Sequence, residues 1–300
     1  MSASAITFSI QSLTKDFKEI TKAGLAISVV FSSLAGYLLG IDDYKSIDWL
    51  VLVLLAVGGY CMVGASNAYN QVIEKDLDAL MDRTKNRPVA SGRMHPNKAL
   101  FVASLLTMIG LVLLYIINPK SAMFGAISIF LYTSVYTPLK KVTPLSVFVG
   151  AFPGAIPFML GWVAATNHFG IEAGTLFLIQ FFWQFPHFWS IGWFLYEDYE
   201  KAGFFMLPTG KKDTSTALQT ILYTIWLIVA SLLPALGYTG QLFISPIAAV
   251  LVLILGLWML YFAFKLYSLR TSKAAKSLML VSVSYITLLQ MVYIFDKFLR

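Results

Sequence analysis

Runs of about 20 apolar residues follow one another along most of this chain, and a run of that length can cross about 30 Å of hydrocarbon as a helix. Of the 300 residues, 58% are hydrophobic and only 12% are charged, whereas soluble domains carry about 25% charged residues. The mean hydropathy is +0.74. The sequence therefore predicts an all-α, polytopic membrane bundle that forms a single domain over residues 1–300.

The apolar runs predict nine transmembrane helices, and the loops between them predict their orientation. Cytosolic loops of membrane proteins carry an excess of Lys and Arg. With the N-terminus in the cytosol, 18 of the 22 cations fall on the cytosolic side. The two long polar loops, 70–98 and 196–216, then lie on that side, so we expect a central cavity that faces the cytosol. The expected spans are 23–41, 49–69, 99–117, 121–138, 145–166, 174–195, 217–238, 242–264 and 277–296.

The remaining composition excludes several classes of protein. The net charge of +7 is interpreted as cytosolic loops beside anionic lipid, because no basic soluble module is present that would bind nucleic acid. The single cysteine, Cys61, allows no internal disulfide and no cysteine metal site. The first 21 residues contain no arginine and no short signal-peptide core, which favours a bacterial inner membrane over a mitochondrial one.

The most informative polar segment follows the second predicted span. Four acidic residues lie within residues 74–82, and Arg83, Lys85 and Arg87 follow at once. At 100° per residue, Asn70, Glu74 and Asp78 fall within an arc of about 80° together with Asn67. Hard oxygen ligands suit Mg²⁺, which commonly uses one or two carboxylates and takes its other ligands from phosphate and water. We therefore predict that Asn70, Glu74 and Asp78 bind Mg²⁺; the alternative is a solvated charged loop.

The three cations of this segment complete the predicted site. Arg83, Lys85 and Arg87 are placed to hold the phosphate groups that the metal would bridge. Farther along, Tyr136 and Lys140 are four residues apart at the end of the fourth span, and we predict that both are catalytic, with Lys140 neutralising a diphosphate leaving group. The alternative for Lys140 is an ordinary cytosolic anchor.

A second polar stripe follows the sixth predicted span. Gln180, Gln184, His187 and Asp198 fall within about 60° of one another on a helical wheel. Polar groups inside a membrane usually face a cavity or the bundle interior. We predict that Asp198 supplies a second metal site opposite Glu74 and Asp78, and that His187 is a functional residue. The alternative for His187 is a hydrogen bond between helices.

With these residues considered together, the chain resembles the UbiA superfamily of intramembrane prenyltransferases from about residue 20 to residue 295. The first family motif reads Asn70, Glu74, Asp78, then Arg83-Thr84 and Arg87-Pro88, with Glu74 in place of the usual aspartate. The run at 136–141 and the Gly- and Pro-rich stretch from Gly150 to Gly161 are similar to further family motifs. The segments 183–188 and 198–208 resemble the heme-modifying subgroup, which implies that His187 and Gln184 contact heme. The second Asp-x-x-x-Asp motif of quinone-type members is missing from this region.

The resemblance implies an activity. Farnesyl diphosphate would ionise with the help of Mg²⁺ as cofactor, and a vinyl group of heme b would capture the allylic cation before water adds, giving heme O for heme-copper oxidases. It also allows heme A synthase or oxidase-assembly proteins as partners. Two other interpretations stay open from the sequence: prenylation of another aromatic or quinone-precursor acceptor, and membrane transport.

Overall fold

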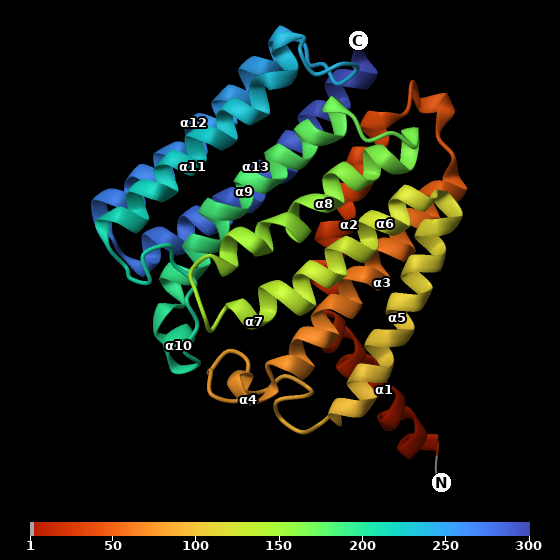
Figure 1. Cartoon of the computed structure of the whole chain (residues 1–300), viewed down its shortest axis with the longest axis vertical. Coiled ribbons are helices and arrows are strands. Elements are labelled where there is room, and N and C mark those ends of the chain that lie inside the picture. The colour runs from red at the N-terminus through yellow and green to blue at the C-terminus, as the bar shows by residue number, and fades with distance from the viewer. Residues whose placement is uncertain (1–2) are drawn as a thin grey trace.

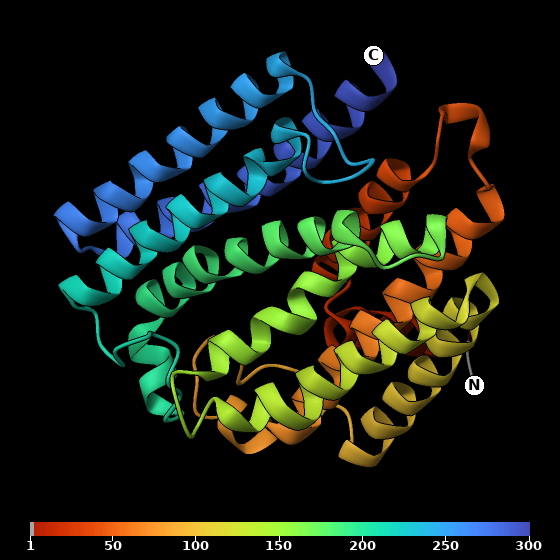
Figure 2. The same ribbon diagram turned by 45° about the horizontal axis from the view of Figure 1, so that its top comes forward.

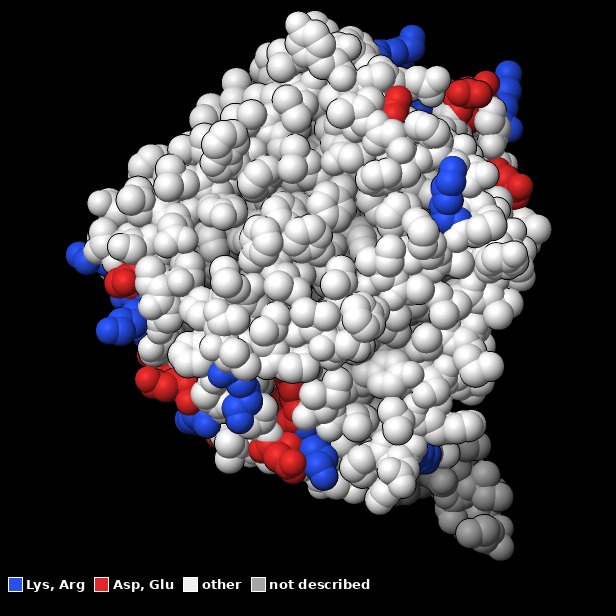
Figure 3. Space-filling view, viewed as in Figure 1, with Lys and Arg blue, Asp and Glu red and all other residues white. Residues whose placement is uncertain are grey.

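The computed structural model describes residues 3–300, and these residues form helices joined by loops, with no strand among them. Eight of the described helices are long and apolar enough to cross a membrane. Figure 3 shows the charged side chains gathered toward two opposite ends of one face, with an uncharged band between them. These features are those of an integral membrane protein. The bounds are α1 Ala3–Thr21, α2 Ala23–Gly40, η1 Tyr44–Ser46, α3 Trp49–Ile73, α4 Lys75–Asp78, α5 Pro96–Ile117, α6 Pro119–Phe130, η2 Leu131–Tyr136, α7 Thr137–Leu139, α8 Ser146–Thr166, α9 Ile171–Phe194, α10 Tyr196–Lys201, α11 Thr214–Leu232, η3 Leu233–Leu236, α12 Pro246–Leu269 and α13 Ser272–Leu299.

The long helices match the nine predicted spans closely when α6, η2 and α7 are counted as one. The helix that falls outside the eight apolar ones is α9, which has 24 residues. Its length suffices for a span, but Gln180, Gln184 and His187 lower its hydropathy. The predicted span 242–264 begins later, at Pro246, because Ser245 caps α12 by accepting a hydrogen bond from the Ala248 amide.

The long helices lie side by side, with α11–α13 on one side, α3, α5 and α6 on the other, and α8 and α9 between them (Figure 1). The turned view in Figure 2 shows the same order. The loop that contains α4 and the short helix α10 lie at one end of the bundle in both views. The two long polar loops therefore meet, as expected for a site built from both.

Helices α2 and α8 approach so closely that their contact leaves no room for side chains. A Cβ atom placed on Gly36 of α2 would lie 2.0 Å from the Phe158 carbonyl oxygen, and one placed on Gly161 of α8 would lie 1.8 Å from the Ser33 carbonyl oxygen. Small residues permit such close approach of membrane helices. This contact fixes α2 against the Gly- and Pro-rich helix α8.

Candidate active site

A cavity of about 470 Å³ lies in the centre of the bundle. Residues from α2, α3, η2, α8, α9 and α13 line it, so it is enclosed by segments far apart in the sequence. Its charged lining residues come from the end of the bundle where α3 ends. They are Lys22, Glu74, Asp78, Arg83, Arg87 and Lys140. We call this charged part of the cavity the mouth.

The first motif lies at the mouth. Helix α3 ends at Ile73, where Glu74 leaves helical geometry with φ −98° and ψ 12°, and the one-turn helix α4 follows. Despite this break, Asn70, Glu74 and Asp78 all line the cavity and are buried. The shared face predicted for them is therefore present, although it spans two helical segments rather than one.

Both carboxylates of the motif are paired with buried or half-buried cations. Lys140 Nζ lies 2.5 Å from Glu74 Oε1 in an ion pair in which both side chains are buried. Arg87 Nη1 donates to both Asp78 oxygens, at 2.8 Å and 2.7 Å. The predicted acids and cations are thus brought into direct contact, with no bulk solvent between them.

Lys140 is held in place by aromatic rings as well as by Glu74. Its Nζ lies 4.9 Å from the centre of the Tyr136 ring and 5.3 Å from that of Phe204. The segment before it, η2, has wide π-helical turns, in which Thr137 Oγ1 donates to the Tyr132 carbonyl oxygen five residues earlier. Such turns are frequent at functional sites. Tyr136, which we predicted to be catalytic, is buried and lines the cavity beside Lys140.

The donor atoms at the mouth fit a hard divalent cation. Among the described residues no group of three His, Cys, Asp or Glu could hold a metal by itself, but Mg²⁺ commonly needs only one or two carboxylates. Asn67 Oδ1 and Asn70 Nδ2 are buried without a hydrogen-bond partner. Amide oxygen and nitrogen exchange places on a flip, so Asn70 can present an oxygen beside Glu74.

Lys22 is a cation of the mouth that the sequence analysis missed. It stands between α1 and α2 in a left-handed conformation, with φ 48°, and it lines the cavity. Burial, together with the nearby charges of Arg87, Lys140 and Arg83, lowers the pKa of Lys22 to about 7, although Glu74 opposes this shift. An isolated lysine directly before an apolar run is the signal that could have indicated it.

Two of the predicted ligands occupy other positions. The Asp198 carboxylate accepts hydrogen bonds from the backbone amides of Asp82 and Arg83, at 2.8 Å and 3.3 Å, and is not among the cavity-lining residues. Lys85 donates to Asp82 Oδ1 at 2.7 Å and is also outside the lining. The hydrogen bonds from Lys201 and Lys85 hold the pKa of Asp82 near 2. Asp198 thus joins the two long loops, whereas Lys85 is paired within its own loop. Arg83 and Arg87 are the cations of loop 70–98 that line the cavity.

The polar stripe of α9 faces the cavity as predicted, since Gln180, Gln184 and His187 all line it. Gln180 accepts a hydrogen bond from Gln290 Nε2 of α13. The Gln184 amide lies where a side chain on Gly154 would be, 2.5 Å from the position of its Cβ. A larger residue at 154 would therefore displace the Gln184 amide from its present position.

His187 has one nitrogen fixed by α13. Its Nδ1 lies 2.8 Å from Ser282 Oγ, and Ser282 Oγ donates its only proton to the Met279 carbonyl oxygen. While donating to Met279, the Ser282 hydroxyl can accept from a His187 ring that is protonated on Nδ1, and this tautomer has a lone pair on Nε2. The Trp183 ring is stacked on the imidazole at 4.5 Å, and its Nε1 donates to the Ser282 carbonyl oxygen.

Comparison with known proteins agrees with this geometry. Residues 29–288 match the model of the UbiA prenyltransferase family. The chain belongs to this family. Among UbiA relatives, it is 79% identical to a protoheme IX farnesyltransferase of Flavobacterium johnsoniae over 100% of both chains. It is 72% identical to the enzyme of the same name from Flavobacterium psychrophilum over 97% of both chains.

Solved structures of UbiA proteins share the fold. A structure reported for digeranylgeranylglyceryl phosphate synthase has a TM-score of 0.79 and 18% identity, covering 97% of this chain and 100% of its own. A UbiA homolog from Archaeoglobus fulgidus bound to GPP and Mg²⁺ has a TM-score of 0.64 and 15% identity, covering 93% of this chain and 99% of its own. The UbiA resemblance and the all-α membrane architecture predicted from the sequence are confirmed.

Proposed function

We propose that this chain transfers the farnesyl group of farnesyl diphosphate to a vinyl group of heme b, with addition of water, giving heme O and diphosphate. The observation that carries the proposal is one cavity with two chemically different parts. Paired acids and cations form its mouth, and an imidazole with a free Nε2 lies on α9 farther along the same cavity. The names of the relatives at 79% and 72% identity support the same reaction.

The mouth fits a metal-bound diphosphate. Asn70, Glu74 and Asp78 would hold Mg²⁺, which when bound neutralises charge on the departing diphosphate. The Archaeoglobus fulgidus homolog bound to GPP and Mg²⁺ supports this cofactor. Lys140 and Arg87 would turn from their carboxylates to phosphate oxygens, joined by Arg83 and Lys22. Before substrate binds, the pairs Glu74–Lys140 and Asp78–Arg87 compensate the charges of these four side chains. With substrate bound, the two acids would pair with Mg²⁺ and the two cations with phosphate oxygens.

The remainder of the cavity fits a carbocation reaction. Departure of diphosphate leaves an allylic cation, and aromatic faces such as Tyr136 stabilise positive charge. The terminal vinyl carbon forms the new C–C bond, the adjacent carbon takes the charge, and water adds there with loss of a proton. His187 would contact the heme through Nε2, by ligating iron or by accepting a hydrogen bond, because neutral imidazole is a common iron ligand. Gln184 would contact the same substrate.

The direct test uses purified protein in detergent with heme b, farnesyl diphosphate and Mg²⁺. Heme O identified by mass spectrometry, and its loss when Mg²⁺ is chelated, is the expected result. An enzyme that prenylates a quinone precursor but not heme b would contradict the proposal.

We further propose that the protein lies in a bacterial inner membrane with its N-terminus and the mouth in the cytosol. The cation distribution supports this orientation. Reporter fusions after Lys98, Lys212 and Lys276 should report the cytosol, and a fusion after Asn167 should report the opposite side. A loop 196–216 outside the cytosol would refute the orientation.

A further inference from the structure

The cavity has two unlike walls beyond its mouth. The wall formed by α9 and α13 carries polar side chains, including Gln180, His187 and Gln290. The wall formed by α2, α3 and α8 carries Val29, Val63 and Pro157, and its polar groups beyond the asparagines of α3 are the small hydroxyls of Ser28, Ser32 and Ser66. A hydrocarbon chain leaving the mouth is therefore best accommodated along the second wall.

One face of α3 runs along this wall and changes from polar to apolar. Glu74 at the mouth is followed inward by Asn70, Asn67 and Val63, at helical spacing, and all four line the cavity. Met62 is the neighbour of Val63 on α3 and lines the adjoining space rather than the cavity; it is about 18 Å from Glu74 along the axis at 1.5 Å per residue. A farnesyl group has twelve carbons in its main chain, which extend over roughly 15 Å with bonds of about 1.5 Å. The lengths of the wall and the substrate are thus similar.

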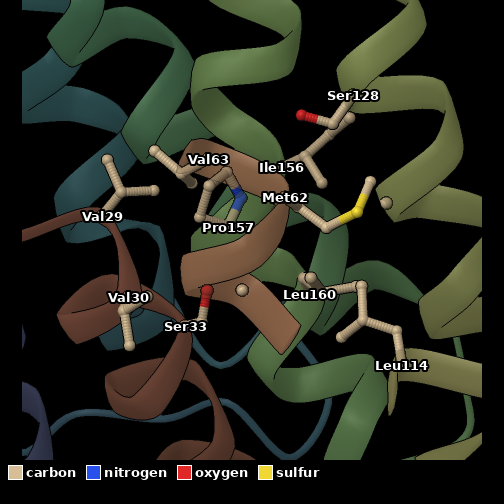
Figure 4. A pocket seen from close by; sticks show the side chains of 12 residues that line it. Val29, Val30, Ser33, Met62, Val63, Leu114, Ser128, Ile156, Pro157 and Leu160 are labelled. Atoms are coloured by element: carbon tan, nitrogen blue, oxygen red, sulfur yellow. The ribbon is translucent and has the colours of Figure 1, made fainter. Parts of the chain in front are cut away.

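A small apolar pocket of about 30 Å³ lies at this depth. It shares Val29, Val63, Ser128 and Pro157 with the cavity, so the two spaces have a common wall. Figure 4 shows Met62 in this pocket, with Leu114 and Leu160 beyond it. Its polar lining side chains are hydroxyls, of Ser33 and Ser128, and no charged side chain lines it.

We propose that this side pocket receives the distal end of the isoprenoid chain and that Met62 sets the chain length the enzyme accepts. The proposal rests on the proposed prenyl transfer. Met62 would make the site specific for diphosphates with three isoprene units. A longer chain would meet the Met62 side chain, because the side pocket is too small to hold a further unit.

Met62 is suited to this position by its surroundings. It is 6% exposed, and its Sδ would lie 2.7 Å from a Cβ atom on Gly110. Gly110 of α5 therefore makes the room in which the thioether is placed. Methionine has three rotatable bonds and fills irregular gaps. Its replacement by alanine removes three heavy atoms beside the pocket and extends the space toward Gly110 of α5 and Gly125 of α6.

The test compares kcat/KM for geranyl, farnesyl and geranylgeranyl diphosphates with heme b, using purified full-length variants. Met62→Ala should raise the ratio of geranylgeranyl to farnesyl transfer about tenfold, since small changes in an apolar pocket alter discrimination by about 10- to 200-fold. Val63→Phe, which narrows the approach to the pocket, should lower the ratio of farnesyl to geranyl transfer by a similar factor. Met62→Leu should stay near the wild type.

Met259→Ala is the matched control, because Met259 is fully buried on α12 and lines neither space. Ratios within twofold of the wild type in Val63→Phe and in Met62→Ala would overturn the proposal; Val63→Phe alone decides it if Met62→Ala does not fold. A wild-type protein that transfers none of the three groups to heme b would instead refute the proposed function, so the two failures are distinct.

Discussion

At the mouth of the cavity, the acids Glu74 and Asp78 are paired with Lys140 and Arg87, and all four side chains face the space where a substrate would bind. At the opposite end of the bundle, Lys297 of α13 donates hydrogen bonds to backbone carbonyl oxygens at the end of α2. Both ends thus contain charged groups that are withdrawn from solvent. The partners differ: side chains beside a cavity at one end, and the backbone of a neighbouring helix at the other.

The backbone partners make the opposite end a structural clamp. Lys297 Nζ bonds the carbonyl oxygens of Leu39, at 2.6 Å, and of Ile41, which α2 cannot satisfy within itself at its C-terminal end. Asp296 accepts from the Ser245 amide at 3.0 Å and ties α13 to α12. Backbone carbonyl oxygens are fixed parts of the fold and cannot move to a substrate. We therefore expect Lys297 to contribute to the stability of the folded protein. The ion pairs of the mouth can exchange partners and should control activity.

The largest effect is expected from neutralising the acids of the mouth. Glu74→Gln or Asp78→Asn should lower farnesyl transfer by about 100-fold or more, the scale of losing one preorganised electrostatic group. Asp76→Asn is the control, because Asp76 lies between these acids in sequence and its side chain is 89% exposed. Turnover is measured with variants that purify as folded protein. Near-normal rates in both acid variants would remove these residues from the mechanism.

Lys297→Met tests the other end. Two carbonyl groups lose a charged donor, so the variant should unfold more easily by about 1–3 kcal/mol, seen as a lower thermal midpoint in detergent. Turnover of the folded fraction should stay near that of the wild type. Lys45→Met, on an exposed side chain of the same end, should leave the midpoint unchanged. A loss of turnover with an unchanged thermal midpoint in Lys297→Met would contradict the assignment of Lys297 to stability rather than activity.

His187 has features of both ends of the bundle. Its Nδ1 is held by Ser282 of a neighbouring helix, and its Nε2 is available to a substrate in the cavity. His187→Ala should shift the Soret band of bound heme and weaken heme binding while leaving diphosphate binding largely intact. Ser282→Ala should weaken heme binding about tenfold, the lower end of the effect of removing a partner that orients a ligand. Wild-type heme spectra and affinity in His187→Ala would leave this residue with its interhelical hydrogen bond alone.

The pH dependence of diphosphate binding should reveal Lys22. With a pKa of about 7, Lys22 is charged below that pH and loses its proton above it, so its attraction for diphosphate fades as the pH rises. Inorganic pyrophosphate should bind the wild type about tenfold more tightly than Lys22→Met at pH 6, the scale of a hydrogen bond to a charged group, and the ratio should shrink by pH 8.5. The nearby cations Arg83, Arg87 and Lys140 are present in both proteins. The ratio of the two affinities therefore reports the contribution of Lys22. A ratio that is constant with pH would contradict the assignment.

The smallest effect is expected at the exposed loop contact. Asp82→Asn should change turnover by less than about twofold, because its ion pairs are exposed and solvent and salt screen them. The pKa of Asp82 is about 2, lowered from the ordinary value of about 4. Its contribution to stability is therefore complete above about pH 4 and is lost as the pH falls toward 2. If turnover changed strongly between pH 6 and 8 in Asp82→Asn but not in the wild type, the contact between the two loops would contribute to catalysis as well as to structure.

The sequence predicts the elements and residues whose signal is local. Helical spacing alone brings Asn70, Glu74 and Asp78 to one face, and apolar length alone gives the spans. The partners of His187 and Asp198 depend on helices and loops far apart in the chain, which spacing does not contain. Ser282 is one serine among several on α13, and only the packing of α9 against α13 selects it. Lys22 was missed because its side chain enters the cavity from a helix junction, where a helical wheel has no meaning.

The contact between Gly36 and Gly161 has a consequence for reading mutational surveys of this protein. A methyl group at either position would have to displace a carbonyl oxygen of the facing helix, a change that no repacking of side chains relieves. Substitutions there should be among the least tolerated in the chain although neither glycine lines the cavity. Intolerance at these two positions therefore reports helix assembly, and a map of sensitive residues will mark a second region that has no part in the chemistry.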